Sequence, residues 1–181
     1  MRAPSPLPAL VLCAVALGAA APAAAAAPPV GSSTWALAEP VAAVDARKAQ
    51  ALEATVGTII APLRPLARSR MAGKPDTCRR YLLEINAQQV VVRCDAEAVT
   101  VPLTGGTVPV TAHDGTPMQA RAALSAGALT LRFEGEQATL ETRFRVEGGQ
   151  LLVQKEIQSS FFAVPLRCDF RYAPSAGSAG Q

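Results

Sequence analysis

Histidine is nearly absent from this sequence, which has a single one, His113. Catalytic arrangements of the Ser-His-Asp and Cys-His kinds need a histidine as general base, so each would depend on this residue. It lies in Ala112-His113-Asp114-Gly115, a sequence typical of a solvent-exposed turn. The chain also lacks the spacing of His, Cys, Asp and Glu that zinc sites show. We therefore expect no enzymatic activity, no metal and no cofactor.

Long apolar runs are also missing. The longest, Leu7 to Leu17, is broken by Pro8 and is shorter than the about 20 residues that a membrane-spanning helix needs. It follows Arg2 and precedes an alanine-rich stretch, which is the order of segments in a secretory signal peptide. We therefore expect residues 1–27 to be a signal peptide, and the mature protein to be soluble and either periplasmic or secreted.

Cysteine is scarce, with four in the chain, and Cys13 lies inside the predicted signal peptide. An exported protein meets an oxidising compartment, so two of the other three should pair. Two strand-like runs separate Cys78 from Cys94, and a hairpin between these runs brings the two cysteines together. Cys168 shares the apolar side of its own run, which predicts a buried thiol. A catalytic cysteine is the alternative there, and it would need the single histidine.

Acidic residues are nearly missing from the segment 62–80, in which Asp76 is the only one. Two interpretations of its basic residues stay open. They are the solvated end of a helix, where the helix dipole favours cations, or a weak contact with an anionic surface such as lipid head groups. No aromatic residues alternate with these cations, which argues against nucleic acid. The residues concerned are Arg64, Arg68, Arg70 and Lys74.

Apolar residues at steps of three and four predict an amphipathic helix at 41–61. A second, short helix should follow and end at about Met71, because the two prolines near its start fit the first turn of a helix. The preceding residues 28–40 are rich in Pro, Ser and Ala, so we expect a flexible leader. Trp35 in this leader either docks on the domain or marks a contact with a partner.

From residue 79 the pattern changes to the alternation typical of β-strands, with glycine-containing turns about every ten residues. In the run 138–147, for example, Leu140 and Phe144 alternate with charged residues. A weaker candidate strand, 107–112, is interrupted by Pro109. The other predicted strands are 79–86, 89–94, 97–103, 117–125, 128–134, 138–147, 150–158 and 164–172.

This order of elements predicts an α+β, mainly β domain at 41–172, followed by a disordered tail at 173–181. The helix and the antiparallel meander of seven or eight strands each have one apolar face. The sheet should therefore curl around or onto the helix, as a strongly curved sheet or a partly closed barrel. This arrangement resembles lipocalin-like barrels, cystatin-like curved sheets and the open half-barrels of lipoprotein carriers.

A second resemblance rests on short motifs. Cys78-Arg79-Arg80, Val91-Val92-Arg93-Cys94-Asp95 and the later Pro165-Leu166-Arg167 look like small exported bacterial proteins. That resemblance implies export and brings no activity with it.

Two functions follow from the sequence. The first is a non-enzymatic binding module that holds an apolar small molecule or lipid between the helix and the curved sheet. The second is a protein-interaction or structural component of the cell envelope, with a packed core and no ligand. Phe161 and Phe162 are adjacent and cannot share a strand face, so Phe161 should be exposed, in a bulge or at the mouth of a cavity. The candidate contact residues are Leu131, Phe133, Phe144, Phe161, Phe162, Phe170 and Tyr172.

Overall fold

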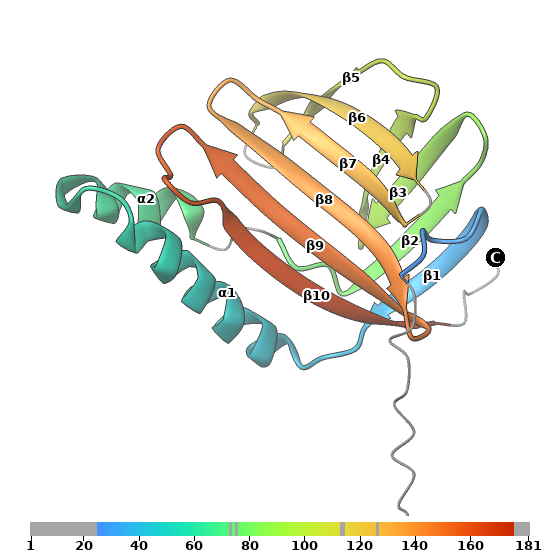
Figure 1. Ribbon diagram of the computed structural model, residues 1–181, viewed down its shortest axis with the longest axis horizontal. Helices are drawn as coiled ribbons and strands as arrows, with labels where there is room; N and C mark the ends of the chain where they lie inside the picture. The colour runs from blue at the N-terminus through green and yellow to red at the C-terminus, as the bar shows by residue number, and fades with distance from the viewer. Residues whose placement is uncertain (1–24, 73, 75, 113–114, 126, 176–181) are drawn as a thin grey trace, which may run out of the picture.

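The computed structural model describes residues 25–175 except 73, 75, 113–114 and 126. Most of the predicted signal peptide, with Cys13, and the turn histidine His113 lie outside the described residues. The α+β, mainly β class is confirmed. Ten antiparallel strands form one strongly curved, nearly closed sheet, and two helices lie against one side of it (Figure 1).

Both helices lie between the first two strands in the chain. Strand β1 (Gly31–Leu37) is followed by α1 (Val41–Gly57), the 3-10 turn η1 (Ala61–Leu63) and α2 (Arg64–Met71). The break near Ala61 and the end at Met71 are as predicted, whereas α1 ends four residues before the expected position. Thr58 closes this end, because its Oγ1 donates a hydrogen bond of 2.6 Å to the carbonyl oxygen of Thr55.

The remaining strands form two meanders, β2 to β4 and β5 to β10, in each of which sequence neighbours pair. The strand order is β4-β3-β2-β1-β10-β9-β8-β7-β6-β5, and the edge strands β4 and β5 contact each other without pairing. All predicted strands are present, and their ends differ by at most two residues from those expected. They are β2 (Arg80–Ile85), β3 (Gln89–Cys94), β4 (Glu97–Pro102), β5 (Val108–Thr111), β6 (Pro117–Ser125), β7 (Ala128–Glu134), β8 (Ala138–Glu147), β9 (Gln150–Ser159) and β10 (Leu166–Pro174).

The prediction of a flexible leader at 28–40 is wrong for Gly31–Leu37, which form strand β1. This strand lies between β2 and β10 in the middle of the sheet, and pairing on both sides overrides its small, polar composition. Trp35 docks on the domain, with 6% of its surface exposed. The predicted tail is also shorter than expected, because β10 extends to Pro174, whose register partner is Trp35. Residues 176–181 lie outside the described residues.

The inside of the curved sheet is filled by its own side chains. The ring of Tyr81 meets Phe144 and Tyr172 edge-on, with centroids 5.4 and 5.0 Å apart. Helix α1 contributes Val44 and Val56 to the core and runs along β10 (Figure 1). The sheet therefore curls around its own aromatic rings, and the helix packs onto its side.

The predicted disulfide between Cys78 and Cys94 is present, with the two Cα atoms 5.3 Å apart. It joins the segment before β2 to the end of β3. Closing a loop of 16 residues stabilises the fold by about 3 kcal/mol in the chain-entropy account. Cys168 is a free and buried thiol, as its strand position predicted.

Candidate binding groove between helix α1 and strand β10

Helix α1 lies beside a part of β10 that β1 does not reach. The pairing of β1 with β10 involves Tyr172, Ala173 and Pro174 of β10. Earlier in β10, the backbone carbonyl groups on this edge accept hydrogen bonds from residues outside the sheet. The Ala38 N–H bonds the Arg171 carbonyl oxygen at 2.9 Å, and Arg47 Nη2 bonds the Asp169 carbonyl oxygen at 3.0 Å. Ala38, which precedes α1, and Arg47 within α1 thus give partners to backbone groups of a strand edge that β1 leaves unpaired.

A groove of about 410 Å³ lies between α1 and this part of the sheet. Its helical wall consists of side chains at steps of three and four residues, which share one face of a helix. Its size falls in the range of small-molecule sites. The lining residues are Val44, Arg47, Lys48, Gln50, Ala51 and Ala54 from α1, Gln154 from β9, and Arg167, Cys168, Asp169 and Phe170 from β10.

The charged side chains around the groove are held in place by ion pairs. Arg47 donates two hydrogen bonds to Glu39, at 2.6 and 3.0 Å, and these bonds lower the pKa of that carboxyl group. Lys48 Nζ lies 3.1 Å from Thr77 Oγ1 and 3.6 Å from Asp45 Oδ1. The groove therefore combines fixed polar side chains, among them Arg47 and Lys48, with the small apolar side chains of Ala51 and Ala54.

A row of polar residues crosses the otherwise apolar inner face of the sheet next to this groove. Thr142, Lys155 and Cys168 are register partners on β8, β9 and β10. Their exposed fractions are only 4%, 8% and 7%. Cys168 lines the groove itself. Sequence reasoning missed Lys155, although its alternation with Val153 and Ile157 marks it as facing inward.

Lys155 is the one charged residue among the described residues that is buried. Its Nζ donates a hydrogen bond of 2.6 Å to the carbonyl oxygen of Asp76 and lies 5.8 Å from the centre of the Phe170 ring. Burial lowers the pKa of Lys155 from 10.5 to about 8. Burial also raises the pKa of the Cys168 thiol, which keeps it protonated and unreactive at neutral pH.

Most of the predicted contact residues lie in the packed interior. Their exposed fractions are 2% for Leu131, 1% for Phe144 and Phe170, 0% for Tyr172 and 8% for Phe162. Side chains with almost no accessible surface leave no water-sized space beside them. Phe133 is half-buried, Phe161 is 53% exposed, and Phe170 alone of the seven lines the groove. That any of them contacts a ligand stays a prediction.

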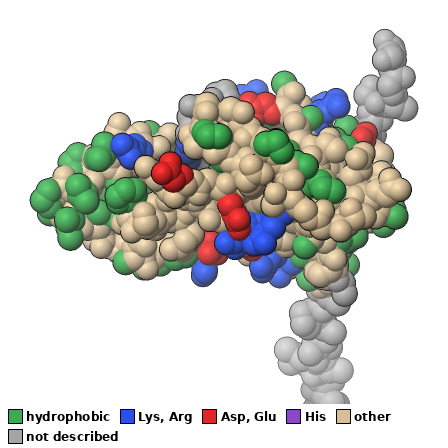
Figure 2. All heavy atoms as spheres, turned by 90° about the horizontal axis from the view of Figure 1, so that it is seen from above, with side chains coloured by type: hydrophobic (Ala, Val, Ile, Leu, Met, Phe, Trp, Pro, Cys, Tyr) green, Lys and Arg blue, Asp and Glu red, His purple; other side chains and the backbone are tan. Residues whose placement is uncertain are grey.

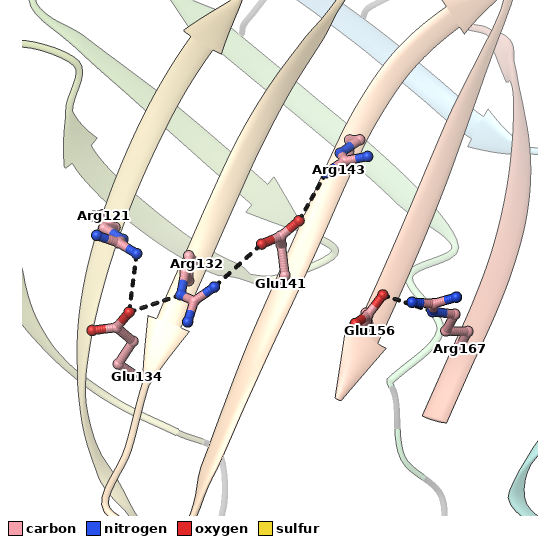
Figure 3. A network of polar contacts seen from close by, with 7 residues as sticks. All are labelled: Arg121, Arg132, Glu134, Glu141, Arg143, Glu156 and Arg167. Atoms are coloured by element: carbon pink, nitrogen blue, oxygen red, sulfur yellow. Dashed lines mark hydrogen bonds and ion pairs between the residues drawn. The ribbon is translucent and has the colours of Figure 1, made fainter. Parts of the chain in front are cut away.

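The outer face of the sheet carries a network of alternating charges (Figure 3). Glu134 contacts Arg121 at 3.1 Å and Arg132 at 2.7 Å, and Glu141 continues the network toward Arg143. Partly exposed pairs of this kind contribute at most about 1 kcal/mol each. Each of the two glutamates is paired with two arginines, so the network offers a ligand no unpaired carboxylate.

The part of the chain that the structure describes offers neither a metal site nor a membrane-spanning helix. It contains no group of three His, Cys, Asp or Glu residues that could hold a metal ion. None of its helices is long and apolar enough to cross a membrane.

No family model and no curated protein sequence matches this chain. Among solved structures, Echinococcus granulosus fatty-acid-binding protein 1 aligns with a TM-score of 0.43 and 10% identity, over 81% of this chain and 97% of its own. Apo Caenorhabditis elegans lipid binding protein 8 aligns with a TM-score of 0.44 and 11% identity, over 81% of this chain and 94% of its own. Likenesses this distant carry no argument about what this chain binds.

Proposed function

We propose that this protein is an exported, non-catalytic binding module that holds an apolar small molecule or lipid in the groove between α1 and β10. The observation that carries this function is the open groove of about 410 Å³ between helix and sheet, beside a solidly packed interior. The disulfide between Cys78 and Cys94 supports export, because such bonds persist in oxidising compartments.

The groove is open where two positions of its helical wall carry small side chains. Ala51 and Ala54 end at Cβ, and longer side chains at these positions would reach into the space. An apolar chain lying there would be removed from water along α1, a gain of roughly 25 cal/mol for each Å² buried. The neighbouring polar groups, among them Lys48, would meet the polar end of an amphipathic ligand.

Filling the groove should abolish binding without disturbing the fold. Ala54 is exposed and lines the groove, so Ala54→Trp is expected to weaken binding of an apolar fluorescent probe at least tenfold, because the indole occupies the space. The probe is anilinonaphthalene sulfonate, titrated by fluorescence.

Ala46→Trp is the matched control, because Ala46 is also exposed on α1 but lies outside the groove. It should bind the probe as the wild type does. Equal affinities of the two variants would refute the groove as the binding site.

The second candidate function is a protein-interaction or structural component of the envelope. The close packing of Tyr81, Phe144 and Tyr172 favours it, because a ligand chamber inside the sheet would need these rings to part. Phe161, 53% exposed on the loop between β9 and β10, is then the proposed partner contact. Native mass spectrometry of protein purified from its own compartment separates the two functions. A co-purifying small molecule supports the binding module, and a mass equal to the chain alone supports the second function.

A further inference from the structure

The turn between α1 and α2 exposes three large apolar side chains. Ile60, Leu63 and Leu66 have exposed fractions of 68%, 39% and 50%. Leu63 and Leu66 lie three residues apart in the helical stretch that begins at Ala61, and Ile60 caps the start of that stretch. Figure 2 shows hydrophobic side chains gathered at the left end of the molecule, which is the end where α1 and α2 meet in Figure 1. We call Ile60, Leu63 and Leu66 the apolar tip.

The fold itself does not use the apolar tip. Helix α2 attaches to the domain through Met71, which is buried, and Ala67, which packs against the core. The tip side chains point elsewhere and stay in contact with water. An exposed apolar cluster rimmed by polar residues is typical of a surface that meets a partner or a membrane.

The charged residues around the apolar tip are mostly basic. Between Ala54 and Pro75 the chain contains four basic residues and no acidic one. Arg68 is paired with Glu53 at 2.8 Å. Arg64 donates to the carbonyl oxygens of Ile59 and Gly57, at 2.9 and 3.1 Å, which closes the end of α1 and leaves its charge uncompensated. The tip therefore carries a net positive charge. The basic residues are Arg64, Arg68, Arg70 and Lys74.

We propose that the α1–α2 turn docks on an anionic lipid bilayer, with the apolar tip in the interface and the surrounding cations against the head groups. Membrane-surface segments combine these two features, an apolar side that enters the interface and basic residues that meet anionic lipid. A soluble polyanion would engage the cations and leave Ile60 and Leu66 in water. A bilayer accommodates both the apolar tip and the surrounding cations. This docking does not depend on whether the groove binds a small molecule.

Vesicle flotation tests the docking. The wild-type protein should float with vesicles of phosphatidylglycerol and phosphatidylcholine, should bind phosphatidylcholine vesicles much less, and should be released by salt. The variant Ile60→Ser/Leu66→Ser is expected to lose at least tenfold in affinity. Arg70→Gln is expected to lose roughly fivefold, because each cation near an anionic surface contributes about 1 kcal/mol.

Matched controls carry the same changes away from the tip. Val30→Ser/Leu124→Ser removes two apolar side chains that are 73% and 41% exposed, and Arg93→Gln removes an exposed cation of β3. Both should bind vesicles as the wild type does, and far-UV circular dichroism should show all variants folded. Equal binding to neutral and anionic vesicles would overturn the proposal. So would a loss on Arg70→Gln with none on the Ile60/Leu66 variant, which indicates a polyanion contact instead.

Discussion

Phe144→Ala is expected to lower the free energy of unfolding by about 3–5 kcal/mol, the usual cost of truncating a buried phenylalanine. The ring is 1% exposed and meets Tyr81 edge-on at the centre of the sheet's inner face. Its register partners Leu129 and Val153 are fully buried as well, so few neighbours can move in to fill the space. Urea denaturation at neutral pH, followed by Trp35 fluorescence and circular dichroism, measures the loss.

Phe161→Ala is the control for this variant, because the same side chain is 53% exposed there. It should change the free energy of unfolding by no more than about 0.5 kcal/mol. Similar losses in the two variants would mean that the interior is less well packed than the structure shows.

The same variant distinguishes a packed interior from a ligand chamber. A cavity lined by apolar side chains stays dry and takes up small apolar molecules. Benzene should therefore stabilise Phe144→Ala more than it stabilises the wild type. Stabilisation of the wild type by benzene, retained in Ala54→Trp, would move the binding site from the groove to the interior.

The strands from residue 80 onward could be predicted because their signals are local. Leu140 and Phe144 alternate with charged residues, and glycine turns separate the runs. The same reasoning missed β1, whose short, polar sequence is held by pairing with Tyr81 on one side and Pro174 on the other. Pairing with residues so distant in the chain cannot be recognised from the local pattern of apolar and polar residues.

The candidate site was harder to predict than the fold. The alternation of side chains along the strands correctly predicted that Phe144, Phe170 and Tyr172 face inward. Alternation does not show whether space remains beside a side chain. The groove depends on where α1 lies against the edge of β10, and this placement follows from the whole sheet. The alternation in β9 did carry one usable signal, since it puts a lysine at an inward position.

Replacing that lysine by an apolar residue of similar length, in Lys155→Met, is expected to raise the free energy of unfolding at pH 7. Burial lowers the pKa of Lys155 to about 8, against 10.5 when exposed. The unfolded chain therefore holds the proton more tightly, and protonation favours unfolding. The shift corresponds to about 3 kcal/mol at pH 7, and loss of the hydrogen bond to the Asp76 carbonyl oxygen offsets about 1 kcal/mol of it.

The pH dependence of this gain identifies its cause. Below pH 8 the cost of the buried charge is fully present, and it disappears as the pH rises from 8 toward 10.5. The advantage of Lys155→Met over the wild type should therefore shrink by about 3 kcal/mol over this range, in urea denaturations at fixed pH values. Ionisation of the tyrosines affects both proteins and cancels in the difference, whereas Cys168, whose pKa Lys155 lowers, adds a smaller pH-dependent contribution. Gln154→Met, at the adjacent position on the same strand, is the control, and its difference from wild type should not vary with pH. If the difference for Lys155→Met were also constant with pH, the lysine would not be buried as a charge. The polar row beside the groove would then lie open to water.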